Sequence, residues 1–147
     1  MRAATDAPHR AVVLDTNIVL DLFVFNDVAA LPLKQALQTG ALDWLATPAM
    51  RDELERVLAY PQIAPRLGFY QLSAADVLAA FDRHARLTDV AAKAPVTCSD
   101  ADDQIFIDLA VAHKAWLLSK DQDVLCMQKR LLALGVRAQA ATNNIAP

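Results

Sequence analysis

The sequence predicts an α/β fold, a three-layer α/β/α sandwich around a mainly parallel sheet of four or five strands. Short apolar runs that suit buried strands alternate along the chain with segments of helical periodicity. Parallel neighbours in a sheet need crossover connections, usually helices, so this alternation favours a parallel sheet covered on both faces. The chain has 147 residues, of which 55% are hydrophobic, which is enough for one well-buried core.

Four apolar runs are predicted to be strands. Residues 11–14 form a compact run with β-branched side chains that ends at Asp15, and residues 42–46 and 115–118 resemble it. A shorter candidate covers residues 136–140. In parallel sheets the ligand crevice lies outside the carboxyl ends of the strands, so acids at those ends are candidates for function.

The helices between these runs have recognisable starts. Thr47 and Pro48 are typical of an N-cap and a first turn, and the helix they begin should end before Pro61. Ser73 and Asp76 form a capping-box pattern for a helix that runs to about Arg86. Three further helices are expected over residues 17–24, over residues 32–38 and after Asp100.

The chain shows no internal repeat and no linker, so we expect residues 11–147 to form a single domain behind a flexible leader, residues 1–10. No apolar stretch is long enough for a membrane span, and the leader lacks the pattern of a secretory signal, so we expect a cytoplasmic protein. Cys98 and Cys126 lack CxxC spacing and the three histidines are far apart, which argues against zinc. The net charge of −3 argues against nucleic-acid binding by bulk electrostatics alone.

Two acids follow predicted strands. Asp15 comes directly after the run that ends at Leu14, and Asp121 follows the run that ends at Leu118. Each has a purely structural interpretation, since Asp forms turns and helix caps routinely.

Two more acids lie on core-facing positions of predicted helices. Glu53 shares a helix face with apolar residues, whereas Glu55 points roughly 200° away and should be solvated. An ion pair with Arg51 or Arg56 would also explain Glu53. Asp103 is in register with the buried stripe of its helix. Asp100 is interpreted instead as a helix cap or as support for the site.

The four acids together predict a cation site. Carboxylates gathered in one place repel each other unless they are protonated or neutralised by cations. Oxygen ligands without cysteine or clustered histidine select Mg²⁺ or Mn²⁺, and such cations can activate water against a phosphodiester. The sequence contains no GxSxG motif and no glycine-rich phosphate loop, so no side-chain nucleophile is indicated.

The ordered set of motifs resembles the PIN-domain (PilT N-terminus) nuclease family, in particular its bacterial toxin-like members. The resemblance spans residues 11 to about 140 and rests on four segments: Val12 to Asn17, Glu53 to Leu58, Asp100 to Asp103 and Leu117 to Asp123. It implies a PIN-like sheet, an acidic pocket for Mg²⁺ or Mn²⁺ and hydrolysis of RNA phosphodiester bonds.

The resemblance also assigns roles to individual residues. Asp15, Glu53, Asp103 and Asp121 match the metal-binding, catalytic acids of the family. Asn17 matches a polar helper that orients Asp15 or a water, and Ser119 and Asp123 match supporting positions. The basic residues considered for RNA contact are Lys120, Arg51 and Arg56. Lys120 stands where the family often has a small residue.

The resemblance extends to partners. Many small bacterial members are toxins of toxin–antitoxin pairs and dimerise, which implies a small antitoxin partner and a homodimer for this chain. Two other functions fit the acids. One is a Mg²⁺-dependent phosphatase or phosphotransferase with Asp15 as covalent nucleophile, although such enzymes usually place a second Asp where this chain has Asn17. The other is a non-catalytic module that binds a regulatory cation.

Overall fold

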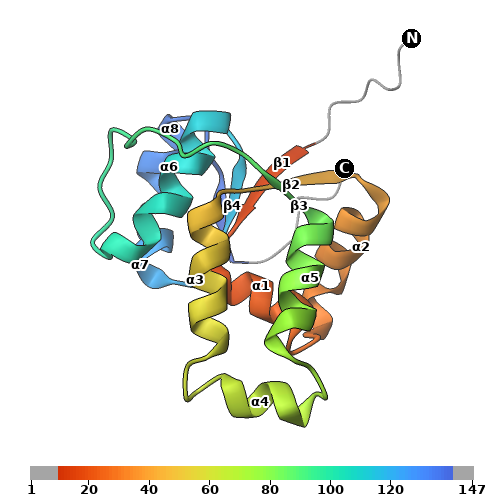
Figure 1. The fold of residues 1–147 in the computed structure, drawn as a ribbon. Coiled ribbons are helices and arrows are strands. Elements are labelled where there is room, and N and C mark those ends of the chain that lie inside the picture. Colours follow the sequence, from red (N-terminus) through yellow and green to blue (C-terminus); the bar gives the residue numbers. More distant parts are fainter. Residues whose placement is uncertain (1–9, 141–147) are drawn as a thin grey trace.

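The computed structural model describes residues 10–140, and within them a five-stranded, fully parallel sheet lies between two groups of helices (Figure 1). The strand order is β3-β2-β1-β4-β5. The strands are β1 (Arg10–Leu14), β2 (Leu42–Ala46), β3 (Ala85–Leu87), β4 (Trp116–Leu118) and β5 (Ala138–Gln139). This is the predicted three-layer α/β/α fold.

Eight α-helices and two short 3-10 helices connect the strands within the described residues. They are α1 (Thr16–Phe23), η1 (Val28–Ala30), α2 (Leu31–Thr39), α3 (Pro48–Leu58), α4 (Ala64–Phe69), α5 (Ala74–His84), η2 (Ala101–Asp103), α6 (Gln104–His113), α7 (Gln122–Leu125) and α8 (Gln128–Ala133). Figure 1 shows α2 and α5 on one side of the sheet and α6 to α8 on the other.

The hydrophobic core lies on both faces of the sheet, because helices cover each face. The central strand β1 contributes Val12 and Val13, both fully buried, because neighbouring strands flank it and helices cover it. Helix α6 packs on β1 and β4, while α2 packs on β2 and α5 packs on β3. Trp44 of β2 is buried and packs edge-on against Phe81 of α5.

All four predicted strands are confirmed, with small shifts at their ends. The first begins at Arg10, inside the predicted leader, and the last is shortened to Ala138–Gln139. The remaining leader residues, 1–9, and the C-terminal residues 141–147 lie outside the described part of the chain. The Ser73–Asp76 capping box is present, with both reciprocal hydrogen bonds.

One strand was missed by sequence reasoning. The helix predicted to reach Arg86 ends at His84, and Ala85–Leu87 then forms the edge strand β3 without an intervening loop. Three residues give too little alternation to reveal a strand, and two of them are exposed. Arg86 is held there by Asp43 of β2, whose Oδ2 lies 2.6 Å from Nη2.

No single helix in residues 10–140 has both the length and the apolar content to cross a membrane. The pair formed by Thr16–Phe23 and Val28–Thr39 passes the same test only when combined, and it is bent by 104°. Ile18, Leu22 and Leu33 of this pair are buried in the core, which is the position expected of core helices.

Candidate metal site at the carboxyl edge of the sheet

The site lies where the connections from β1 and β4 diverge to opposite faces of the sheet. β1 leads into α1 and towards β2, whereas β4, its neighbour on the other side, is reached through α6. The backbone N–H of Asp15 donates to Leu118 O at 2.9 Å, so the two strands end side by side. Crevices at such switch points are the usual ligand sites of parallel sheets.

Asp15 occupies the cap position of α1 without acting as a cap. Its side chain makes no capping hydrogen bond. Instead, Oδ2 accepts a 2.6 Å hydrogen bond from Ser119 Oγ at the end of β4. Asp15 is only 5% exposed, and burial raises the pKa of its carboxyl despite the stabilising hydrogen bond from Ser119. The structural interpretation as a helix cap therefore does not account for this residue.

Glu53 reaches the site from α3, which starts at the carboxyl end of β2. Its Oε2 accepts a 2.6 Å hydrogen bond from Thr16 Oγ1, at the first position of α1. Burial and then the charge of Asp15 raise the pKa of Glu53, although the Thr16 hydrogen bond and Arg56 act in the opposite direction. Glu55 is exposed, as the helical phase predicts.

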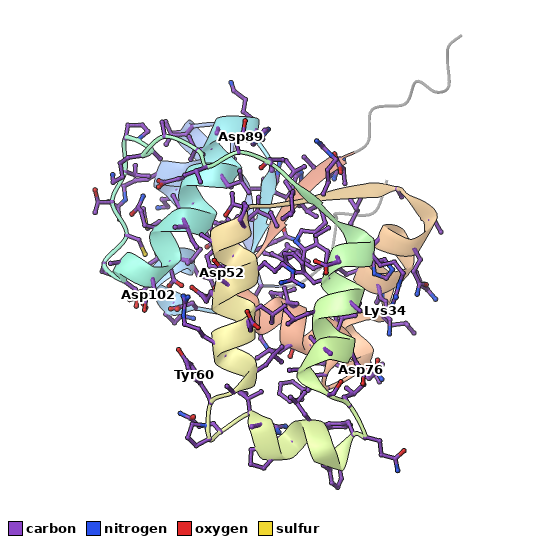
Figure 2. All side chains as sticks on the ribbon, in the orientation of Figure 1. Lys34, Asp52, Tyr60, Asp76, Asp89 and Asp102 are labelled. Carbon is purple, nitrogen blue, oxygen red and sulfur yellow. The ribbon has the colours of Figure 1, made fainter. Side chains whose placement is uncertain are left out.

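The three aspartates at the start of α6 differ in burial and in capping. Asp100 Oδ1 accepts a hydrogen bond from Asp102 N at 2.9 Å, which makes Asp100 a cap. Asp102 is exposed, and Figure 2 shows it at the surface near the start of α6. Asp103 is 6% exposed and makes no capping bond. Its Oδ2 is a buried atom without a hydrogen-bond partner in the described residues.

Asp121 and Asp123 complete the acidic group from the start of α7. The backbone N–H of Asp121 donates to Ser119 Oγ at 3.0 Å, and Oδ1 of the Asp121 side chain accepts from Asp123 N at 2.9 Å. Asp123 Oδ1 in turn accepts from Ser99 Oγ at 3.1 Å. These bonds fix both side chains relative to the ends of β1 and β4.

Four carboxylates converge closely. One oxygen from each of Asp100, Asp103, Asp121 and Asp123 lies within 4.8 Å of the others. Mg²⁺ binds oxygen at roughly 2.0–2.1 Å, so opposite ligands stand about 4 Å apart, and a small contraction of this group would suit it. Burial, the close carboxyl of Asp121 and the charge of Asp15 raise the pKa of Asp103 to about 8.

The donor set fits a hard cation. In residues 10–140, neither Asp15, Glu53 nor Asp103 forms an ion pair with a lysine or arginine. All the convergent ligand atoms are carboxylate oxygens, and the unpartnered Asp103 Oδ2 leaves a buried acceptor for which a cation would provide a partner.

The basic residues considered for RNA contact behave differently from one another. Arg51 makes two hydrogen bonds to Asp82 of α5, at 2.7 and 2.9 Å. Lys120 Nζ lies 2.6 Å from Asp21 Oδ2. Arg56 is exposed on α3, and Asn17 is exposed on α1, whereas the side-chain hydrogen bond to Asp15 comes from Ser119.

Sequence reasoning missed Thr16, the residue that connects Glu53 to the end of β1. Thr16 is buried although polar, and its place directly after a strand-end acid is a usable signal. Ser99 was missed too, since a serine before an acidic run resembles an ordinary helix start.

The parallel sheet and the acidic crevice at its switch point place the chain among α/β proteins with an acidic site at the carboxyl edge of the sheet. Comparison with known protein families gives the particular family: the PIN domain matches residues 11–123, which is well over half of the chain. The chain therefore belongs to the PIN-domain family. No curated protein matches it closely enough for comparison.

Proposed function

We propose that this protein is a Mg²⁺- or Mn²⁺-dependent endoribonuclease whose cations are held by Asp15, Glu53, Asp103 and Asp121. Two observations carry the proposal: one carboxylate oxygen from each of Asp100, Asp103, Asp121 and Asp123 lies within 4.8 Å of the others, and Oδ2 of Asp103 is buried without a hydrogen-bond partner in the described residues. Asp15 and Glu53 are not part of this group of four, and they are included because, besides burial, the charge of Asp15 raises the pKa of both Asp103 and Glu53. A group of this kind is strongly self-repulsive without bound cations.

The chain's own residues orient two of the proposed ligands and control the charge of a third. Ser119 and Thr16 donate hydrogen bonds that fix the carboxylates of Asp15 and Glu53. Such hydrogen bonds to ligands typically affect metal affinity 10- to 100-fold. Asp103 must release a proton before it can bind a cation, because its pKa is raised to about 8. The chemistry that divalent cations supply in such sites is a lowered pKa for water and stabilisation of charge on phosphate oxygens.

The substrate and the biological setting follow from the family. RNA is the proposed substrate, and toxin activity with a small antitoxin partner and a homodimer is proposed on the same ground. Two free thiols, Cys98 and Cys126, suit the reducing cytoplasm that we propose as its location.

Two glutamates on one helix provide the matched test. Glu53→Ala should abolish cleavage of a single-stranded RNA, whereas Glu55→Ala should cleave at the wild-type rate, because Glu55 is exposed. EDTA should stop cleavage, and Mn²⁺ should restore it. Asp15→Ala, Asp103→Ala and Asp121→Ala should each behave like Glu53→Ala.

Two results would contradict the proposal. One is RNA cleavage that survives EDTA and Glu53→Ala. The other is a covalent phosphoryl-aspartate on Asp15, trapped with a fluoride analogue, which would establish the phosphotransferase alternative.

A further inference from the structure

A pocket of about 450 Å³ lies beside the acidic crevice, between the start of α2, the helix α1 and the end of β4. Its volume falls within the roughly 300–1,000 Å³ of small-molecule sites. The buried residues Ile18, Leu33 and Leu118 form its apolar floor. Val28, Ala30 and Pro32 form an apolar rim, and the charged residues that line it are Asp21, Asp27 and Lys120. An apolar pocket with few, grouped polar atoms is the usual form of a specific ligand site.

The pocket adjoins the candidate metal site through the backbone of Asp15. Leu118 O accepts from Asp15 N at 2.9 Å, and Ile18 N donates to Asp15 O at 2.9 Å. Lys120 stands between Ser119, which hydrogen-bonds the Asp15 carboxylate, and Asp121. Consecutive Cα atoms are about 3.8 Å apart, so the pocket wall and the acids are one residue from each other.

The Asp21–Lys120 ion pair is unusual for its surroundings. Asp21 lies on the buried side of α1 with a side chain only 12% exposed, and its Oδ2 is 2.6 Å from Lys120 Nζ, whose side chain is 47% exposed. Desolvating a carboxylate is costly, and a well-packed apolar pair often gives equal or greater stability. Stability alone therefore gives no strong reason to have this pair, while ligand recognition does.

We propose that this pocket binds a guanine base of the RNA next to the cleaved phosphodiester, an inference that rests on the proposed ribonuclease function. Lys120 has three N–H donors, of which the ion pair uses one, so it can also donate to guanine O6. The second oxygen of the Asp21 carboxylate accepts from guanine N1–H or N2–H. Bases of single-stranded RNA are commonly recognised through their Watson–Crick edges in this way.

Guanine complements the pair better than the other bases. It places two adjacent N–H donors beside a carbonyl acceptor, which matches a carboxylate beside an ammonium. Uracil offers one donor beside a carbonyl, and adenine and cytosine offer a ring nitrogen as the nearer acceptor. The more exposed apolar residues that line the pocket, Val28, Ala30 and Pro32, would cover the base.

Nucleoside binding tests the pocket independently of cleavage. Guanosine, adenosine, cytidine and uridine would be titrated into the full chain in EDTA by NMR, so that neither a phosphate nor a cation contributes. We expect guanosine to bind at least about tenfold more tightly than the other three, the equivalent of about 1.4 kcal/mol. Lys120→Met should weaken guanosine binding about tenfold, and Lys129→Met, a change at an exposed lysine of α8, should leave it unaltered.

Lys120→Met leaves Asp21 unpaired in a buried setting, so loss of binding could reflect misfolding. The double variant Asp21→Asn, Lys120→Met removes both charges, and it should fold with a wild-type NMR spectrum away from the pocket yet lose guanosine selectivity. Equal affinity for all four nucleosides, or guanosine binding that survives the double variant, would overturn the proposal.

The nucleoside titration and an assay of RNA cleavage together separate this proposal from the ribonuclease proposal. Cleavage without any guanosine selectivity in binding would overturn the pocket assignment alone. Selective guanosine binding without RNA cleavage would overturn the ribonuclease function and leave the base pocket standing.

Discussion

Two groups of carboxylates in this fold meet opposite environments. Asp82 and Asp43 lie towards the β3 edge of the sheet, and each accepts two hydrogen bonds from an arginine, Arg51 or Arg86. Asp15 and Asp103 lie at the switch point, with no ion pair to any residue in the 10–140 range. The arginine lowers the pKa of Asp82, whereas burial raises the pKa of Asp103 to about 8.

The contrast separates two uses of the same side chain. An aspartate beside arginine is already neutralised, so it contributes to packing between elements and has little capacity for a cation. An aspartate that is buried without a cationic partner is unfavourable in the ionised state, and binding a divalent cation relieves that cost. The folded chain therefore places its unfavourable charges at the carboxyl edge of the sheet, where parallel sheets usually hold their ligands.

The largest effect that sharpens this contrast concerns Glu53, whose close partner is a hydroxyl and not an arginine. Thr16→Val removes the donor to Glu53 Oε2 while nearly keeping the side chain's shape. We expect Mn²⁺ affinity to fall about 10- to 100-fold, because groups that orient metal ligands have effects of this size. Isothermal titration with Mn²⁺ measures this.

Thr16→Ser is the matched control, because it keeps the hydroxyl. Its Mn²⁺ affinity should be within about threefold of the wild type, a smaller change than the 10- to 100-fold loss expected when a group that orients a ligand is removed. Equal affinities for Thr16→Val and the wild type would show that Glu53 is positioned by packing alone.

These residues also show how far the sequence could lead. The helical phase identified Glu53 and Asp103 as core-facing and Glu55 as solvated, because burial repeats with the period of the helix. The ends of the predicted strands indicated that Asp15 and Asp121 lie at the same edge of the sheet. Helical phase and strand ends give no information on distances between elements far apart in the chain, so the tight grouping of Asp100 and Asp123 with Asp103 needed the folded structure.

The ion pairs mark a second limit. Lys120 was considered for RNA contact, but it pairs with Asp21, which lies 99 positions away on a helix whose other buried residues, apart from Thr16, are apolar. Arg51 was a candidate partner for Glu53, yet it turns to Asp82 because α3 packs against α5. Side-chain partners of this kind depend on how helices pack, which the periodicity of one helix does not specify.

The next effect concerns stability without metal. A carboxyl whose pKa is raised on folding binds a proton that the unfolded chain has released, so stability falls as pH rises from about 4 to about 8. Asp103→Asn removes this loss. In EDTA it should be more stable than the wild type at pH 8.5 by about 1–3 kcal/mol, the usual cost of an unsatisfied buried polar group, and the gap should close at pH 4. Urea unfolding at both pH values measures it.

Asp82→Asn is the control with the opposite sign. Arg51 lowers the pKa of Asp82 in the folded chain. The stability from this pair is therefore fully present above the pKa that Asp82 has in the unfolded chain, and it is lost as pH falls through the lower pKa of the folded chain. The variant should not gain stability at pH 8.5. A gain in Asp82→Asn equal to that in Asp103→Asn would mean that bulk charge, and not the local environment, governs both carboxylates.

The smallest expected effect distinguishes the two arginines of α3 as contacts for RNA. Arg56 is exposed and makes no ion pair within the described part of the chain, whereas both hydrogen-bonding arms of Arg51 are occupied by Asp82. In an Asp15→Asn background that prevents cleavage, Arg56→Ala should reduce the salt dependence of RNA binding, the slope of log K against log salt, by about 0.7. Arg51→Ala should leave the slope unchanged, because a guanidinium already paired with a carboxylate releases no counterion from a phosphate. Fluorescence anisotropy over a series of salt concentrations measures both slopes.

If Arg51→Ala lowers the slope and Arg56→Ala does not, RNA opens the Arg51–Asp82 pair, and paired and unpaired carboxylates are less distinct than the structure indicates.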